Sequence, residues 1–342
     1  MLDEFLRNFS RNNMKELIAK FVNEVWYKDH FIGTWLMPFS FIFTDVAKFR
    51  RWMYKKGYKS VEKLPVPVII VGNITLGGTG KTPLVIYLVE KLKAAGFKPG
   101  VISRGYGGKS ETWPLRVTAE SDAALIGDEP LLIAQQADCP VAVGPVRADS
   151  ASLLLEEGAI DVIISDDGLQ HYALHRDIEI IVIDGVRRFG NNFCLPSGPL
   201  REPQERTQEV DFVVCNGCEP EENEILMQLD GMDAINLKTQ ERKPLAEFSA
   251  MKCHAIAGIG NPERFFDLLE KQGGKCQTHA FPDHYAFAAK DISFKSAQAI
   301  FMTEKDAVKC RSFASAQHWY VPVKATVDSN FIEKLIALLR TK

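Results

Sequence analysis

The hydrophobic positions of the chain follow two alternating patterns from residue 66 onward. The apolar run Val68–Val71 has the length of a short strand, and a glycine-rich turn separates it from apolar residues that recur at helical spacing up to Gly96. A helical pattern over Arg147–Glu156 lies among later strand-like runs. Those runs are Gly100–Ser103, Pro140–Val143, Val162–Ser165, Ile178–Ile183 and Phe212–Cys215. Strands alternating with helices predict an α/β fold with a mostly parallel sheet and flanking helices.

The same alternation resumes on a smaller scale after about residue 217. It predicts a strand at 255–257, a helix at 262–272, strands near 299–302 and 319–323, and a closing helix at 331–339. We therefore expect a second, smaller α/β domain. The predicted division is an N-terminal helical region over 1–60 that forms one domain with a core over 61–217, followed by a C-terminal domain over 218–342.

The first 60 residues combine helical, aromatic and basic segments. Aromatic residues from Phe31 to Phe43 lead into lysines and arginines between Lys48 and Lys59, with no acidic residue among them. Such a segment is typical of an amphipathic anchor at a membrane surface, and also of a helix on the protein's own core with a solvated basic face. The uncharged stretch 31–44 is shorter than the roughly 20 residues that cross a bilayer. Upstream, apolar residues recur at helical spacing: Met14, Leu17, Ile18, Phe21, Val22 and Val25.

Composition and charge exclude some classes of protein. Hydrophobic residues make up 46% and charged residues 25%, as in an ordinary globular protein. The net charge of −3 gives no broad basic field, which argues against a dedicated nucleic-acid binder. Asp3 and Glu4 stand where a secretory signal would carry positive charge. The seven cysteines are scattered, which fits a reducing compartment.

One segment has the pattern of a loop that binds nucleotide phosphates. Glycines let successive backbone N–H groups face phosphate oxygens, the lysine neutralises the β- and γ-phosphates, and the final threonine hydroxyl binds Mg²⁺. The usual first glycine is replaced by Thr75. The alternative is a glycine-rich turn with an incidental lysine, but a strand before the loop and a helix after it favour the phosphate loop. Its residues are Thr75, Leu76, Gly77, Gly78, Thr79, Gly80, Lys81 and Thr82.

Two carboxylates follow the predicted strand Val162–Ser165. Asp166 and Asp167 would lie at the carboxyl end of that strand, where open α/β sheets collect their ligands. Asp167-Gly168 also fits a solvated turn. Together with the phosphate loop, the pair indicates a Mg²⁺ site for a bound nucleotide.

Other polar clusters are less specific. Asp128 and the pair Asp283-His284 each offer a group that can accept the proton of an attacking hydroxyl, although such residues are commonly surface or capping groups. Three arginines are candidate anion ligands or ordinary surface charges: Arg104, Arg147 and Arg201. Gly258-Ile-Gly260 resembles a dinucleotide motif but has Glu263 in place of the third glycine. Thr303–Asp306 resembles a guanine-specificity loop with its lysine displaced by one position, which favours ATP over GTP.

The ordered set of motifs resembles the tetraacyldisaccharide 4′-kinases, the lipid A 4′-kinases of Gram-negative bacteria. The similarity covers about two-thirds of the chain, and a small hydroxyl residue at the Thr75 position is usual in this family. The matching segments are GNITLGGTGKTP (72–83), SRGYGG (103–108), GDEP (127–130), DDGLQH (166–171), LPSGPLREP (195–203), FPDHY (281–285) and TEKDAVK (303–309).

The resemblance implies a reaction and a location. ATP with Mg²⁺ would phosphorylate the 4′-hydroxyl of a tetraacylated glucosamine disaccharide 1-phosphate and so form lipid IVA in lipid A biosynthesis. The enzyme would be peripheral on the cytoplasmic face of the inner membrane, since a four-chain lipid cannot leave the bilayer cheaply. We expect no nucleic-acid partner and no obligate protein partner.

The resemblance also assigns roles to residues. Lys81 and Thr82 would bind phosphate and Mg²⁺, and Asp166 and Asp167 would shape the metal site, with Glu202 as a possible further ligand. Asp128 would be the base for the sugar hydroxyl, assisted by His284, while Asp283 positions the nucleotide or His284. The remaining assigned residues, His171, Arg104, Arg147 and Arg201, would hold the anionic disaccharide. The C-terminal domain would close over ATP.

Two alternatives from other classes are a P-loop switch or metallochaperone-type NTPase, and a non-catalytic scaffold. The switch would need nucleotide-sensitive segments and a matched base-specificity motif, which the sequence does not show. The presence of Lys81, Thr82, Asp166 and Asp167 argues against the scaffold. ATP turnover that depends on a protein rather than on a glycolipid would favour the switch.

Overall fold

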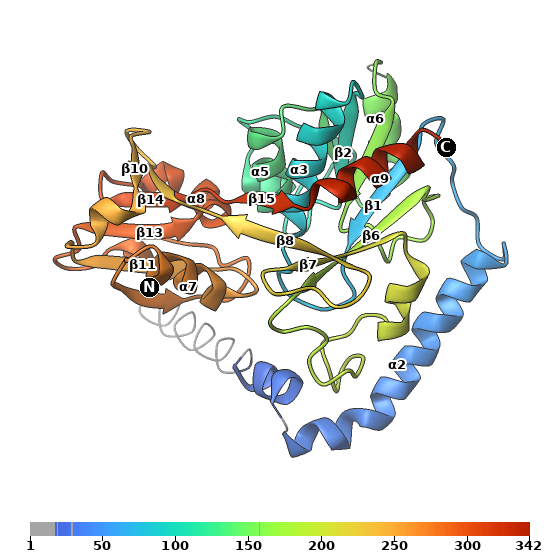
Figure 1. Cartoon of the computed structure of the whole chain (residues 1–342), viewed down its shortest axis with the longest axis horizontal. Helices are drawn as coiled ribbons and strands as arrows, with labels where there is room; N and C mark the ends of the chain where they lie inside the picture. Colours follow the sequence, from blue (N-terminus) through green and yellow to red (C-terminus); the bar gives the residue numbers. More distant parts are fainter. Residues whose placement is uncertain (1–17, 19, 29, 157) are drawn as a thin grey trace.

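The computed structural model describes residues 18, 20–28, 30–156 and 158–342, and these contain two β-sheets (Figure 1). The first has the strand order β15-β8-β7-β6-β1-β5-β2-β4-β3 and is mostly parallel; only β3 and β15 pair antiparallel with their neighbours in it. Its strands are β1 (Val68–Gly72), β2 (Pro99–Ser103), β3 (Leu115–Val117), β4 (Val141–Val143), β5 (Val162–Asp166), β6 (Ile178–Asp184), β7 (Phe212–Asn216), β8 (Glu224–Asp230) and β15 (Lys324–Val327).

Helices cover both faces of the first sheet. Ile69 and Val71 of β1 face a core shared with α3, α5 and α9, whereas Val68 and Ile70 face a core shared with α6. Because β1 is buried on both faces, its sequence is a continuous apolar run rather than an alternating one. The helices are α3 (Lys81–Ala94), α4 (Ala123–Ile126), α5 (Asp128–Gln136), α6 (Arg147–Glu156) and α9 (Ser329–Leu339). The predicted α/β class and mostly parallel sheet are confirmed.

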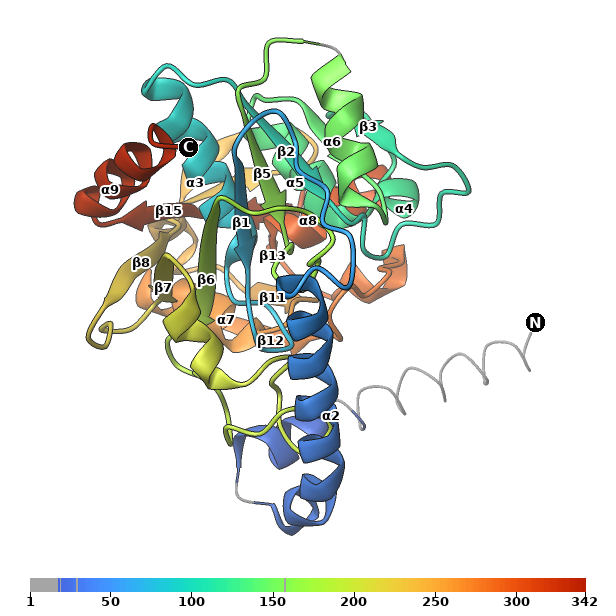
Figure 2. The ribbon, with the colours of Figure 1, turned by 90° about the vertical axis from the view of Figure 1, so that its right-hand side faces the viewer.

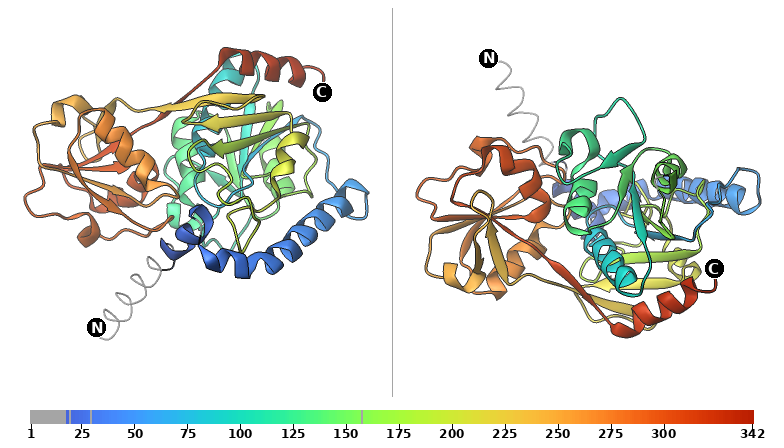
Figure 3. Two further views of the ribbon diagram at one scale, coloured as in Figure 1. Left: turned by 60° about the horizontal axis from the view of Figure 1, so that its bottom comes forward. Right: turned by 90° about the horizontal axis from the view of Figure 1, so that it is seen from above.

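The second sheet lies beside the first and has the order β10-β9-β14-β13-β11-β12 (Figure 3). Its strands are β9 (Asp233–Asn236), β10 (Arg242–Pro244), β11 (Cys253–Ala257), β12 (Cys276–Ala280), β13 (Ala299–Thr303) and β14 (His318–Val321). Helices α7 (Pro262–Lys271) and α8 (Glu304–Cys310) belong to this unit. Short 3-10 helices complete the chain: η1 (Gln204–Glu209), η2 (Leu245–Phe248), η3 (Ala289–Ile292) and η4 (Arg311–Phe313).

The division of the chain between the two sheets does not fall at 217/218, the domain boundary expected from the sequence. β8 pairs with β7, and β15 pairs with β8, so both strands belong to the first sheet. The closing helix α9 packs its buried residues Phe331 and Leu335 into the core of that sheet. The second unit is therefore an insertion between β8 and β15, and the chain returns to the first unit afterwards (Figure 1). Periodicity finds the strands but does not say which sheet each one joins.

Helix α2 (Phe31–Lys55) is continuous, with Pro38 inside it, and extends away from both sheets (Figure 2). Its small residues face the protein: the Ser40 hydroxyl donates to the Cys194 carbonyl at 2.6 Å, and Gly33 is buried. Its large aromatic residues face outward, and Trp35 is 77% exposed. The aromatic face is therefore not packed on the protein's own core, contrary to one of the two interpretations of the sequence. Among the described residues, no helix is long and apolar enough to cross a membrane.

The helix expected from the apolar repeat upstream of α2 is present where the structure describes the chain. Residues 20–27 are helical, and Val25 is buried. Phe21 and Ile18 are exposed. Met14 and Leu17, also part of that prediction, lie outside the described residues.

Candidate active site

The phosphate loop connects β1 to α3. Gly80 has φ 97° and caps the N-terminus of α3, and a Cβ at this position would collide with the Asn216 side chain, so glycine is required. Thr75, which replaces the usual first glycine, is buried and forms an antiparallel bridge with Leu200. Such extended backbone suits a threonine, so the departure from the usual pattern leaves the loop intact.

A cavity of about 170 Å³ lies over this loop, between the two units. The first unit contributes the loop itself and residues of α3, α5 and β8, and the second contributes the segments after β11 and β13 and the end of β14. Ile86, Leu132, Val321 and Val323 supply apolar surface, which suits a nucleotide base, while the N-terminus of α3 favours phosphate. We call it the nucleotide pocket. Its lining includes Gly78, Thr79, Gly80, Lys81, Thr82, Glu129, Gln136, Gly260, Asn261, Arg264, Glu304 and Lys305.

A second cavity of about 510 Å³ lies beside the phosphate loop and is rich in arginine. We call it the arginine pocket. It brings together the four residues that the resemblance assigned to the anionic substrate and adds Arg50 of α2. Burial, followed by the charges of neighbouring arginines, lowers the pKa of His171 to about 4, so this side chain is neutral at pH 7. The lining is Arg50, Leu76, Arg104, Tyr106, Pro145, Arg147, Asp167, Gln170, His171 and Arg201.

Lys81 and Asp167 connect the two pockets. The Lys81 Nζ lies 3.4 Å from Asp167 Oδ1, and the Arg201 Nη1 lies 3.4 Å from Asp167 Oδ2. Burial alone would raise the pKa of Asp167, but Lys81 and Arg201 together hold it at about 2. Asp167 has φ 47°, a conformation that aspartate tolerates in turns and that is frequent at functional sites.

Asp166 is the last residue of β5 and is fully buried. Its Oδ2 accepts a long hydrogen bond of 3.4 Å from the Ser103 hydroxyl, whereas its Oδ1 has no hydrogen-bond partner in the described structure. Burial, with the nearby Glu129 carboxylate, raises the pKa of Asp166 to about 7. An unsatisfied buried carboxylate beside a phosphate loop is the chemistry that a divalent cation would complete.

The residues present fit Mg²⁺ bound together with nucleotide phosphates. Such Mg²⁺ needs only one or two protein carboxylates, because phosphate oxygens and waters fill the other positions. Asp166 supplies a carboxylate, and Thr82 in the first turn of α3 supplies a hydroxyl. Among the described residues, no group of three or more His, Cys, Asp or Glu side chains converges on a metal-sized space. This fits a cation held largely by its nucleotide.

Asp128 and His284 meet across the two units. Asp128 begins α5 after Gly127, whose φ of 93° and contact with the Tyr106 carbonyl oxygen suit glycine. The His284 Nδ1 lies 3.1 Å from Asp128 Oδ1 and 3.2 Å from Oδ2, and the Tyr106 ring packs against the imidazole. Burial favours the neutral form of Asp128, but the hydrogen bond to His284 and the Lys305 charge lower its pKa to about 2. Burial favours the neutral form of His284, but the hydrogen bond to Asp128, together with the charges of Asp283 and Asp128, raises its pKa.

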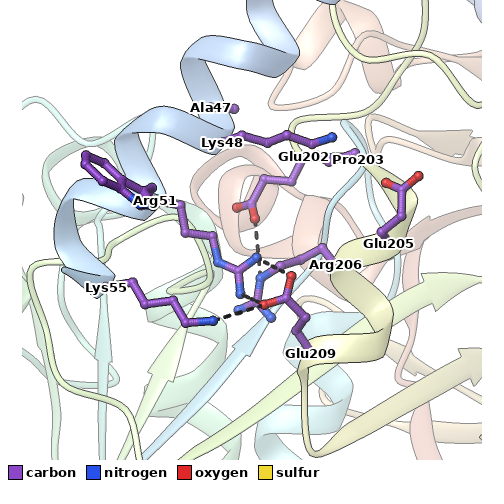
Figure 4. Close-up of a pocket in the computed structure, with 10 residues that line it drawn as sticks. Ala47, Lys48, Arg51, Lys55, Glu202, Pro203, Glu205, Arg206 and Glu209 are labelled. Carbon is purple, nitrogen blue, oxygen red and sulfur yellow. Dashed lines mark hydrogen bonds and ion pairs between the residues drawn. The ribbon is translucent and has the colours of Figure 1, made fainter.

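Glu202, the possible further Mg²⁺ ligand, pairs with Tyr172 and Arg206 in the structure. Its Oε2 accepts a hydrogen bond from Tyr172 at 2.6 Å and pairs with the Arg206 guanidinium at 3.4 Å. It lines neither the nucleotide pocket nor the arginine pocket, but a third cavity beneath α2, next to Arg51 and Glu209 (Figure 4). Glu202 thus lies under α2 in the structure, and its role as a Mg²⁺ ligand stays a prediction.

Comparison with known proteins identifies the family. The family model described as tetraacyldisaccharide-1-P 4′-kinase matches residues 32–340. A tetraacyldisaccharide 4′-kinase of Nitrosococcus oceani is 48% identical over 92% of this chain and 93% of its own length. The chain belongs to the tetraacyldisaccharide-1-P 4′-kinase family.

Other members of the tetraacyldisaccharide-1-P 4′-kinase family agree with this placement. A tetraacyldisaccharide 4′-kinase of Actinobacillus pleuropneumoniae is 50% identical over 88% of this chain and 93% of its own. The crystal structure of LpxK from Aquifex aeolicus in complex with ATP has a TM-score of 0.75 and 29% identity, and the match covers 91% of this chain and 99% of that one. The predicted family is confirmed.

Two residues of the site in this tetraacyldisaccharide-1-P 4′-kinase family member were not expected from the sequence: Lys305 and Glu304. The Lys305 Nζ lies 2.8 Å from Glu129 Oε1 and 3.3 Å from Asp283 Oδ1, so it joins α5 to the segment after β12. Its neighbour Glu304 lines the nucleotide pocket. The signal was present in the motifs GDEP and TEKDAVK, but the charge of Lys305 becomes informative only when its partner Glu129, 176 residues earlier in the sequence, is known.

The contact between Asp128 and His284 should make the stability of the protein depend on pH. Because the folded pKa of His284 lies above the unfolded value of about 6.5, its ionic contribution is complete below that pH and is lost as pH rises through the folded pKa. We therefore expect His284→Gln to lower the melting temperature more at pH 6 than at pH 9. The difference should correspond to about 1.5 kcal/mol, the lower end of the range for a hydrogen bond to a charged group. Scanning calorimetry at both pH values measures it.

The control for this prediction is the partner side chain. Asp128→Asn should remove the same pH-dependent increment, and the double variant should lose no more of it than either single variant. A destabilisation by His284→Gln that is equal at both pH values would contradict the ionic pairing.

Proposed function

We propose that this protein transfers the γ-phosphoryl group of ATP to the 4′-hydroxyl of tetraacyldisaccharide 1-phosphate. The observation that carries the proposal is the Lys81–Asp167 contact, because it joins the nucleotide pocket to an arginine-rich acceptor pocket. Relatives named tetraacyldisaccharide 4′-kinase, at 46–50% identity over most of the chain, support the same assignment.

On the donor side, the chain's task is to position ATP and offset its charge. Backbone N–H groups of the phosphate loop and the N-terminus of α3 face the phosphates, and Lys81 neutralises charge on the β- and γ-phosphates. Bound Mg²⁺ would neutralise further phosphate charge, with Thr82 and Asp166 as its protein ligands. The apolar lining from both units excludes water, which limits wasteful hydrolysis.

On the acceptor side, the arginine pocket suits the anionic 1-phosphate of the disaccharide. The 4′-oxygen forms its bond to the γ-phosphorus while the bond from that phosphorus to the ADP oxygen breaks. The hydroxyl proton passes to Asp128, which His284 orients and stabilises. Because the transition state is loose, a weak base such as Asp128, with its pKa of about 2, suffices.

We also propose that α2 places the enzyme on the cytoplasmic side of the inner membrane as a peripheral protein. The side chains that would enter the interface are 57–77% exposed: Phe31, Trp35, Phe39, Phe41, Ile42, Val46 and Phe49. The basic end of α2 carries Lys48, Arg50 and Lys55, which suit anionic lipid headgroups. Since Arg50 also lines the arginine pocket, the same helix would bring the acceptor pocket to the lipid surface.

The function is tested by following labelled γ-phosphate from ATP into tetraacyldisaccharide 1-phosphate in detergent micelles. The expected product is the bisphosphorylated lipid, formed only when both substrates are present. Folded protein that hydrolyses ATP and leaves the lipid unchanged would overturn the proposal. ATP turnover that requires a protein instead of the glycolipid would favour a switch NTPase.

The membrane proposal predicts that Trp35→Ser together with Phe39→Ser weakens binding to vesicles of phosphatidylethanolamine and phosphatidylglycerol by about 100-fold. Each exposed aromatic residue that enters the interface should contribute about 1.4 kcal/mol, or tenfold. Vesicle sedimentation measures the partitioning. The matched control is Met232→Ser, which removes an exposed apolar side chain on the second unit and should have no effect. Equal binding by all variants would contradict the role of α2.

A further inference from the structure

The glycine motif around Gly260 lines the nucleotide pocket, but the function described so far does not explain why glycine stands there. In the structure it lies directly on the phosphate loop. A Cβ at Gly260 would collide with the Gly78 backbone nitrogen and would stand 3.0 Å from Gly77 Cα. Backbone of the second unit therefore touches backbone of the phosphate loop, with no side chain between them. The need for glycine at this position comes from that close approach.

Arg187 holds this contact from the side. Its Nη1 donates a hydrogen bond of 2.6 Å to the Gly260 carbonyl oxygen and stands next to Gly77, where an added Cβ would lie 3.7 Å away. The residue follows β6, and its backbone nitrogen donates to Asp184 Oδ1 at 3.0 Å. The other oxygen of the buried Asp184 accepts from Asn261 Nδ2 at 2.9 Å. Asp184 thus anchors Arg187 and the residue after Gly260 at the same point.

A third element reaches Arg187 from the N-terminal region. The guanidinium carbon lies 5.4 Å from the centroid of the Tyr27 ring, a distance suited to a cation–π contact. The neighbouring Trp26 donates from Nε1 to the Pro196 carbonyl at 3.0 Å, and its own carbonyl accepts from the Asn191 nitrogen at 2.9 Å. The N-terminal helical segment is therefore seated on the same stretch of chain that carries Arg187.

We propose that Arg187 is a positioning residue that holds the Gly260 segment against the phosphate loop, and that Tyr27 orients its guanidinium so that docking of the N-terminal segment favours the closed nucleotide pocket. The inference rests on the proposed function for its role in catalysis. Arg187 itself lines neither the nucleotide pocket nor the arginine pocket. It acts by changing the fraction of molecules in which the second unit covers the phosphate loop.

This mechanism has a distinct kinetic signature. The apparent affinity for a ligand falls in proportion to the population of the binding-competent state. ATP binding itself favours closure, so saturating ATP restores much of the closed state. Loss of Arg187 should therefore raise the KM for ATP more than it lowers kcat, whereas loss of a charge-neutralising residue such as Lys81 lowers kcat.

The test measures the dissociation constant of a non-hydrolysable ATP analogue with the full-length protein by calorimetry. Arg187→Met should weaken binding about tenfold. Arg187→Lys, which keeps a donor but loses the planar group, should recover part of the loss. Tyr27→Leu should weaken binding about threefold, and Tyr27→Phe, which keeps the ring, should bind as wild type. The double variant Arg187→Met with Tyr27→Leu should be no weaker than Arg187→Met alone.

The matched control is Arg188→Met. Arg188 is adjacent in sequence but pairs with Glu221 and Glu224, away from Gly260, so its loss should leave nucleotide affinity unchanged. Analogue binding needs no lipid and no phosphoryl transfer, so a failure here is distinguishable from a failure of the proposed kinase activity. Wild-type affinity in a folded Arg187→Met variant would overturn the inference. If that variant does not fold, equal affinity of Tyr27→Leu and Tyr27→Phe would overturn it.

Discussion

Lys81→Ala should lower the rate of phosphoryl transfer by about a thousandfold, the scale on which preorganised charge acts in a water-excluded site. In a loose transition state the charge is spread over the phosphoryl oxygens, and catalysis consists mainly of positioning and neutralisation. Lys81 is the first residue of α3, so its ammonium group and the helix N-terminus act on the same phosphates. Asp167 lies 3.4 Å from the ammonium and fixes its direction.

The same argument ranks two variants. Asp128→Ala should cost less than Lys81→Ala, about a hundredfold, because general-base assistance typically contributes 10²–10⁴ and the loose transition state needs little of it. The measurement is kcat for transfer of labelled γ-phosphate to the lipid at saturating ATP. Lys93→Ala is the control: it removes a lysine from the far end of α3, where the side chain pairs with Asp138. A larger loss in Asp128→Ala than in Lys81→Ala would contradict this allocation of roles.

The central strands and the phosphate loop were predictable because their physical causes are local. β1 and the greater parts of β5 and β6 are buried on both faces, so these stretches are runs of apolar residues. The predicted helix Arg147–Glu156 coincides with α6. The Gly80-Lys81-Thr82 turn is likewise fixed by local backbone geometry and helix chemistry.

The remaining elements depend on contacts that are distant in sequence. Two of the four residues of β15 are exposed, and the segment becomes a strand by pairing with β8, about 100 residues earlier. Two residues of the site also depend on contacts distant in sequence. Gly260 must be glycine because the phosphate loop lies against it, and Lys305 pairs with the Glu129 carboxylate of α5. Glu202 follows Arg201 directly, yet the two side chains face different cavities. The order of the motifs therefore does not say which cavity each of these neighbouring side chains lines.

Asp166→Asn should separate activity from stability. We expect it to reduce phosphoryl transfer about a thousandfold, because an amide cannot replace the carboxylate as a Mg²⁺ ligand. We expect the same substitution to raise the melting temperature of the protein measured without nucleotide and Mg²⁺. Asp166 is fully buried, its Oδ1 has no hydrogen-bond partner in the described structure, and burial together with Glu129 disfavours its charge. Asparagine has nearly the same shape and removes that charge.

A gain of about 1–2 kcal/mol in the free energy of unfolding, or a few degrees in melting temperature, is the expected size of this effect. The matched control is Asp161→Asn, which lies just before the opposite end of β5 and accepts a hydrogen bond from the Lys98 nitrogen. It should change neither activity nor stability appreciably. If Asp166→Asn lost activity and also melted lower, the carboxylate would be stabilising the fold. If it melted higher, β5 would end in a charge that opposes folding, and its place beside the phosphate loop would follow from catalysis alone.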